Sequence, residues 1–260
     1  MIRKSLADGL FALCVRCGCL LLLWMMPGDL FAASDDAAFP NGRLVIISGA
    51  THGVYYQLSD DLRMLGQLHG FEIIVKPSVG SLDNLMSIVN DDGINMALIQ
   101  ADVPSWIAAR LRQSDRPGSD VRKFLVKVRT LYPLYDEMVQ IVARQEIKGL
   151  PDLKGRRVSA GLQKSGTYLT MGNIFQKEGL NIDSVPLALN EALTKLRSGE
   201  LDAVAVVSGY PIAALQAFDG KDFHLLPVVL THADPVYLVT EIPANTYGWQ
   251  NETVKTVSVK

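Results

Sequence analysis

Cysteine is almost missing from this chain of 260 residues. The three cysteines, Cys14, Cys17 and Cys19, all lie near the amino terminus. The Cys14-x-x-Cys17 spacing occurs in redox and zinc sites, but no residues elsewhere in the sequence complete a zinc site. We therefore expect no disulfide framework, no metal site and no redox centre in the rest of the chain.

An excess of charge of one sign is missing as well. The sequence has 25 Lys and Arg against 27 Asp and Glu, a net charge of −2. A near-neutral balance gives no support for binding nucleic acid or an acidic polymer. The one basic run, residues 122–129, alternates with apolar side chains, so we interpret residues 121–128 as a strand flanked by solvated charges.

Long apolar runs are also absent. The longest, residues 17–26, has ten residues, whereas a membrane-spanning helix needs about 20. Arg3 and Lys4 precede the run, Pro27 and Gly28 break it, and small residues follow up to Ala33. This order is typical of an export signal. We predict a signal peptide over residues 1–33 and a periplasmic mature protein, with an uncleaved anchor as the alternative.

Catalytic motifs are missing too. Residues 161–167 approach a phosphate-binding loop, but Thr167 stands where its lysine belongs. The pair Gly49 and Gly53 lacks the third glycine of a dinucleotide site, and no G-x-S-x-G elbow occurs. The histidines are scattered, at His52, His69, His224 and His232. The sequence therefore predicts a protein that is not an enzyme and that uses no cofactor.

Three similar turns within residues 44–103 are the most informative feature that is present. Strand-like segments at 44–47, 71–76 and 96–99 each end in a turn of small or polar residues that leads to a helix-like segment. In open parallel sheets such turns gather at the carboxyl ends of the strands, where ligands bind. Helix N-termini there offer free N–H groups to an anion. The pattern predicts a pocket for a small carboxylate.

A second α/β series follows a proline-containing crossing segment near Pro133. We expect strands at 157–160 and 201–207, a helix at 168–178, and a helix at 190–198 that is capped by Asn190 and closed by Gly199. Return strands are expected at 228–230 and 236–240. The alternation predicts an α/β fold with mainly parallel sheets. We divide it into lobe 1 (34–133), lobe 2 (134–228) and a return segment towards lobe 1 (229–260).

The candidate binding residues lie in the turns of both series. Glycines let a backbone approach a ligand closely, and Gln100 and Asp102 end a strand where a carboxylate can receive an ammonium group. For the turn hydroxyls, helix capping and anion binding both stay open, and an exposed loop residue is the alternative for His52. The candidates are Gly49, Thr51, His52, Gly53, Tyr55, Tyr56, Gly80, Ser81, Gln100, Asp102, Ser165, Gly166, Thr167 and Tyr210.

Six motifs in order resemble the TAXI-type solute-binding receptors of TRAP transporters. They are Gly53-Val54-Tyr55-Tyr56, residues 80–85 (GSLDNL), 97–103 (ALIQADV), 152–158 (DLKGRRV), Ser165-Gly166-Thr167 and 199–203 (GELDA). The resemblance runs from about residue 43 to the end. It implies a two-lobed type II periplasmic binding fold and a site formed by the loops at 49–56, 80–81, 100–102 and 165–167.

The resemblance also implies a function. It indicates a monomer that captures glutamate, glutamine or a related small carboxylate and delivers it to TRAP permease subunits in the membrane. His52 departs from the glycine usual in that family. The chain stops at Lys260 within a strand-like run, so we expect the closing part of lobe 1 to be incomplete. The alternatives are a ligand-sensing input protein for a membrane sensor, a truncated receptor without function, and an exported enzyme.

Overall fold

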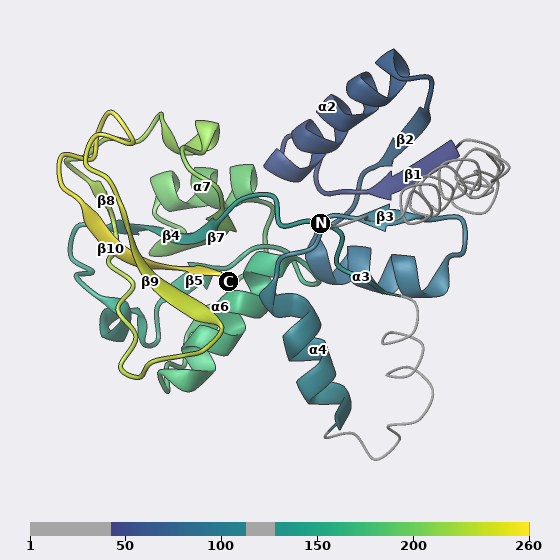
Figure 1. Ribbon diagram of the computed structural model, residues 1–260. Helices are drawn as coiled ribbons and strands as arrows, with labels where there is room; N and C mark the ends of the chain where they lie inside the picture. Colours follow the sequence, from purple (N-terminus) through teal and green to yellow (C-terminus); the bar gives the residue numbers. More distant parts are fainter. Residues whose placement is uncertain (1–42, 113–127, 260) are drawn as a thin grey trace, which may run out of the picture. The chain divides into compact units, whose positions relative to one another are not determined.

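The computed structural model describes residues 43–112 and 128–259, and the statements below refer to them (Figure 1). The predicted signal peptide, the polar lead at 34–42 and nearly all of the strand predicted at 121–128 lie outside these ranges. No helix within the described ranges is both long enough and apolar enough to cross a membrane.

The first sheet is formed by the three βα units that the sequence predicts. Its strands are β1 (Arg43–Ile47), β2 (Glu72–Lys76) and β3 (Met96–Ala97), in the order β2-β1-β3 and all parallel. Helices α2 (Val54–Leu68) and α3 (Ser81–Asn90) connect them, and α4 (Asp102–Arg112) follows β3. The turns after the three strands therefore lie at one edge of the sheet.

The second sheet has seven strands in the order β6-β5-β7-β4-β10-β9, with β8 also paired to β4. The strands are β4 (Glu137–Arg144), β5 (Arg157–Ser159), β6 (Asp183–Ser184), β7 (Ala203–Ser208), β8 (Phe223–Leu225), β9 (Tyr237–Ile242) and β10 (Val254–Val259). Strand β5 is parallel to β6 and β7, whereas β4 is antiparallel to β7, β8 and β10. The prediction of mainly parallel sheets therefore holds for the first sheet and for only one side of the second.

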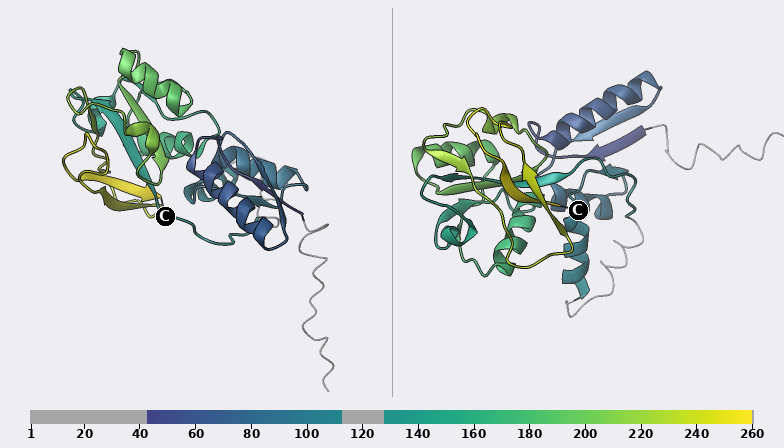
Figure 2. Two further views of the ribbon diagram at one scale, coloured as in Figure 1. Left: turned by 90° about the horizontal axis from the view of Figure 1, so that it is seen from above. Right: turned by 60° about the vertical axis from the view of Figure 1, so that its left-hand side comes forward.

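Within the segment predicted to return towards lobe 1, strands β9 and β10 belong to the second sheet. Strands β9 and β10 pair antiparallel along their whole length, and β10 pairs with β4 at Ser258 and Val259. Figure 2 shows these yellow strands beside the teal and green strands of the same sheet. Val257 and Val259 of β10 belong to the apolar core on one face of this sheet. Residues 228–230 form no strand.

Strand β4 is buried on both faces because helices cover both sides of the second sheet. Val139 and Ile141 belong to a core cluster with residues of α6 (Gly166–Lys177), while Met138 and Val142 belong to a cluster with residues of α7 (Leu189–Ser198). Gly199 closes α7 with φ +88° as predicted, but the N-cap is Ala188 rather than Asn190. Two short 3-10 helices, η3 (Leu150–Leu153) and η4 (Ala213–Leu215), complete the elements.

Candidate functional site

Asp102 accepts side-chain hydrogen bonds from helix α6, from strand β9 and from the loop between β3 and α4. It opens α4 and is 5% exposed. Its Oδ2 accepts from Thr170 Oγ1 of α6 at 2.6 Å and from the Tyr237 hydroxyl of β9 at 3.3 Å. Its Oδ1 accepts from Gln100 Nε2 at 3.0 Å. Burial raises the pKa of Asp102, and these hydrogen bonds offset part of the rise. Asp102 therefore links the end of β3 to the second sheet.

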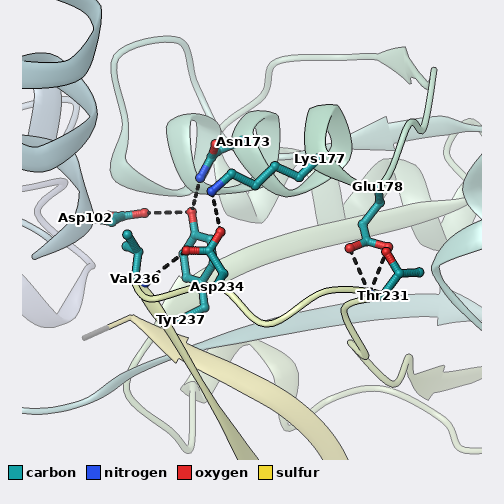
Figure 3. Close-up of polar contacts among 8 residues, drawn as sticks. All are labelled: Asp102, Asn173, Lys177, Glu178, Thr231, Asp234, Val236 and Tyr237. Atoms are coloured by element: carbon teal, nitrogen blue, oxygen red, sulfur yellow. Dashed lines mark hydrogen bonds and ion pairs between the residues drawn. The ribbon is translucent and has the colours of Figure 1, made fainter.

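The Tyr237 hydroxyl connects Asp102 to a group of polar side chains formed by Asn173 and Lys177 of α6 and by Asp234 (Figure 3). Asn173 Nδ2 donates to the Tyr237 hydroxyl at 2.8 Å, and Lys177 pairs with Asp234 just before β9. A pocket of about 330 Å³ adjoins this group. It is lined by Ile174, Lys177, Glu178, Leu230, His232, Ala233, Asp234, Pro235 and Tyr237. The pocket shares none of its lining residues with the predicted binding loops.

Two glycines allow the loops after β2 and β3 to approach the start of α6. A Cβ on Gly166 would lie 2.8 Å from Ser81 Oγ and against the Gln100 side-chain oxygen. Gly80 has φ +135°, and a Cβ there would lie 3.2 Å from the Ser165 Cα. Gly80 needs to be glycine because of its positive φ and the nearby Ser165 backbone. A Cβ on Gly166 would overlap the Gln100 and Ser81 side chains. The structure thus brings Gly80, Ser81 and Gln100 together with Ser165 and Gly166.

The turn hydroxyls are used in hydrogen bonds within the protein. Ser165 caps α6 by accepting from the Tyr168 N–H at 3.1 Å, and Thr167 Oγ1 accepts from the Val207 N–H at 3.0 Å. Ser81 Oγ accepts from the Gln100 N–H at 3.0 Å and does not cap α3, whose N-cap is Gly80. These hydroxyls therefore fix the geometry of the loops that meet here.

The remaining candidates divide between the site and its surroundings. Gly49 packs against Tyr55, since a Cβ on Gly49 would lie 3.2 Å from the Tyr55 Cβ, and Gly53 is the N-cap of α2. Tyr56 is half-buried. Thr51 and His52 are exposed in the first turn, and Tyr210 is 37% exposed beside a cis peptide bond to Pro211. The structure records no contact of Thr51, His52 or Tyr210 with Asp102 or Gln100.

A buried glutamate that the sequence analysis missed lies beside Tyr55. The Tyr55 hydroxyl donates to Glu137 Oε2 at 2.8 Å, and the Tyr55 ring meets that of Tyr135 edge-on at 6.5 Å. Burial raises the pKa of Glu137 to about 8, and the charge of Asp102 adds to the rise. The sequence feature that could have identified Glu137 is the position of its carboxyl at the start of the otherwise uncharged run Met138–Ala143.

Among residues 43–112 and 128–259, no group of His, Cys, Asp or Glu is arranged to hold a metal ion.

Replacing Tyr237 with phenylalanine tests whether the polar group around Asp102 contributes to stability. The change removes one donor from Asp102 and leaves Asn173 Nδ2 without its acceptor. We expect the free energy of unfolding to fall by about 1–3 kcal/mol in urea titrations. The control, Tyr210→Phe at an exposed position, should change it by less than about 0.5 kcal/mol. Equal stability of the two variants would contradict a structural contribution from the Tyr237 hydroxyl.

Comparisons with known proteins found similar solved structures and one matching family. Similar solved structures include an ancestral arginine-binding protein bound to arginine, with 18% identity, a TM-score of 0.47, and 84% of each chain covered. The ligand-binding core of GluR0 from Nostoc punctiforme in complex with L-glutamate has 18% identity and a TM-score of 0.47, covering 83% of this chain and 84% of that one. An amino acid ABC transporter substrate-binding protein from Streptococcus pneumoniae bound to L-arginine has 14% identity and a TM-score of 0.48, covering 85% and 81%. The model of the NMT1-like family matches residues 46–260, and the chain belongs to that family.

Proposed function

We propose that this protein is a periplasmic solute-binding receptor that captures a small carboxylate or amino acid of the glutamate or glutamine kind. It delivers the solute to membrane permease subunits of a TRAP-type transporter and catalyses no reaction. The observation that carries the proposal is the convergence on Asp102 of side chains from β9, from α6 and from the loop between β3 and α4. Membership of the NMT1-like family and the sequence resemblance to TAXI-type receptors support it.

The chemistry of the loops suits a solute with both a carboxylate and polar hydrogens. The buried Asp102 carboxyl can receive an ammonium or amide N–H. The Ser165 hydroxyl lies beside the start of α6, where the helix dipole favours an anion. At the start of α3, the Leu82 and Asp83 N–H groups instead donate to the Lys164 carbonyl. A solute that contacts both sets of groups would stabilise a closed state, in which the groups are close, over an open state in which they are apart. It can shift the equilibrium between these two states only by the difference in its affinity for them.

Isothermal titration of the purified protein with glutamate, glutamine, 2-oxoglutarate and succinate tests the ligand class. We expect saturable binding of at least one of the four with one site per chain. The absence of binding by a folded, monodisperse sample would overturn the ligand proposal. Co-purification of the protein with its permease subunits tests the transport partner separately, and a receptor that binds solute without such association would contradict the assignment to transport.

The substitution Asp102→Asn should weaken solute binding strongly. The amide keeps the shape of the side chain but loses the negative charge and leaves an NH₂ group facing the donors Thr170 and Gln100. We expect the dissociation constant to rise by at least about tenfold, because truncating a buried charged contact costs roughly 2 kcal/mol or more. The control, Asp183→Asn on the exposed strand β6, should leave the constant unchanged. Equal affinities of both variants would remove Asp102 from the site.

A further inference from the structure

Glu137 is a buried carboxyl without a positive partner among residues 43–112 and 128–259. It is the first residue of β4 and is 9% exposed. Within the described ranges, the one side chain that donates to it is Tyr55, whose hydroxyl donates to Glu137 Oε2. No ion pair in these ranges involves Glu137 or Asp102. A carboxylate removed from water is costly unless a cation or several donors compensate its charge. The described residues therefore include two buried carboxyls whose charges interact, and none of the described residues forms an ion pair with either carboxyl.

The described side chains that interact with Glu137 are neutral or acidic. Helix α2 presents Tyr55, whose hydroxyl also interacts with Ser81 of α3. The crossing segment presents Tyr135, α4 presents Asp102, and β10 pairs with Glu137 through the apolar Val259. Within the described part of the chain, only a proton neutralises the charge on Glu137, and a cation for it has to come from elsewhere.

Tyr135 supplies an independent sign that a ligand belongs beside Glu137. Its hydroxyl is buried and has no hydrogen-bond partner. A buried hydroxyl without a partner is uncommon and costs free energy in the empty protein. Tyr135 lies two residues before Glu137, and its ring is edge-on to that of Tyr55. A carboxyl that interacts with two tyrosine side chains offers an ammonium group a negative charge together with hydroxyl oxygens that can accept its N–H groups.

We propose that Glu137, together with Tyr55 and Tyr135, is the specificity-determining group that selects solutes carrying a positively charged nitrogen. The proposal rests on the solute-binding function proposed above and assigns to that site a residue outside the predicted binding loops. The solute nitrogen neutralises Glu137 and gives the Tyr135 hydroxyl a partner. A solute with the same carboxylates but no amine leaves Glu137 without a cation and is rejected.

The pair glutamate and 2-oxoglutarate tests this selection, because the two differ only in an amine against a keto oxygen. Titration of the wild-type protein should show glutamate binding at least about tenfold more tightly than 2-oxoglutarate. In Glu137→Gln the ratio of the two constants should fall to within about twofold. Between pH 6 and 8 the affinity for glutamate should rise in the wild type, since Glu137 must lose its proton, and stay flat in the variant.

The outcomes separate this inference from the function on which it rests. Equal binding of both solutes by the wild type would overturn the selection and leave the receptor function standing. A ratio and a pH profile that persist unchanged in Glu137→Gln would assign the selection to other groups and also overturn it. No binding of any solute by folded protein would overturn the receptor function and the inference together.

A second variant keeps the test valid if Glu137→Gln fails to fold. Tyr135→Phe removes a hydroxyl that has no partner in the protein, so it should fold with undiminished stability. It should weaken glutamate binding several-fold and 2-oxoglutarate binding less. Tyr132→Phe, at a position 76% exposed in the same crossing segment, is the matched control and should change neither constant. Identical affinities in the two tyrosine variants would overturn the proposed contact with the solute.

Discussion

Replacing Gly166 with alanine is expected to reduce both the stability of the protein and its affinity for solute. The new Cβ would lie 2.8 Å from Ser81 Oγ and against the Gln100 side chain, both of which are buried. Neither can retreat easily, because Ser81 accepts from the Gln100 N–H, and Gln100 donates to Asp102 and Thr170. Overpacking of this kind costs about 1–3 kcal/mol, occasionally more.

The same steric cost should appear in binding. If the solute binds the state in which α6 contacts the loops after β2 and β3, destabilising that state by about 2–3 kcal/mol raises the dissociation constant by roughly 30- to 150-fold. Urea unfolding measures the first effect and calorimetric titration the second. A variant with wild-type affinity and stability would show that the close approach at Gly166 does not matter in solution.

Gly172 provides a matched control in the same helix. A Cβ at Gly172 would meet no atom within 4 Å, whereas both residues belong to α6. Alanine there should raise stability by about 0.5–1 kcal/mol, because glycine in a helix interior is unfavourable. If the two substitutions change the stability in opposite directions, the steric effect at Gly166 is separated from helix propensity, which is common to both.

The sequence predicted the local elements well because their signals are local. The strand-turn-helix order of residues 44–103 depends on short apolar runs and on glycines such as Gly80, and the structure confirms it. Gly199 closed α7 as expected, since only the left-handed conformation of that residue was needed. The cap at Asn190 was wrong because the helix begins one residue earlier, at Leu189, with Ala188 as its N-cap.

Long-range pairing was harder to predict. The alternation of residues 254–259 indicates a strand, but it does not say which sheet the strand joins, and β10 pairs with β4 rather than with the first sheet. For the site, Asp102 and Gln100 were predicted from their place at a strand end, and the structure joins them to Thr170. Thr170 and Tyr237 were missed because a threonine within a helix and a tyrosine opening a strand are ordinary core residues in sequence.

Glu137 was missed for a related reason, and its burial leads to a second large effect. In the ligand-free protein, stability should fall as the pH rises from about 4.5 to about 8. The ordinary pKa of a glutamate, 4.5, applies to the unfolded chain, and burial raises the folded value to about 8. Between these values the folded protein binds more protons than the unfolded chain, so its advantage is fully present below pH 4.5 and is lost as the pH rises.

The slope of this loss can reach about 1.4 kcal/mol per pH unit, and the raised pKa of Asp102 adds to it at the acidic end of the window. Urea unfolding at half-unit pH intervals measures the slope directly. Glu137→Gln should flatten it and should make the protein more stable than the wild type at pH 8, because the amide cannot ionise. Glu241→Gln, which replaces an exposed carboxyl on β9, should leave the wild-type profile intact. A Glu137→Gln variant that keeps the full slope would show that Glu137 is hydrated in solution, and the argument for a cation-selecting site would lose its physical basis.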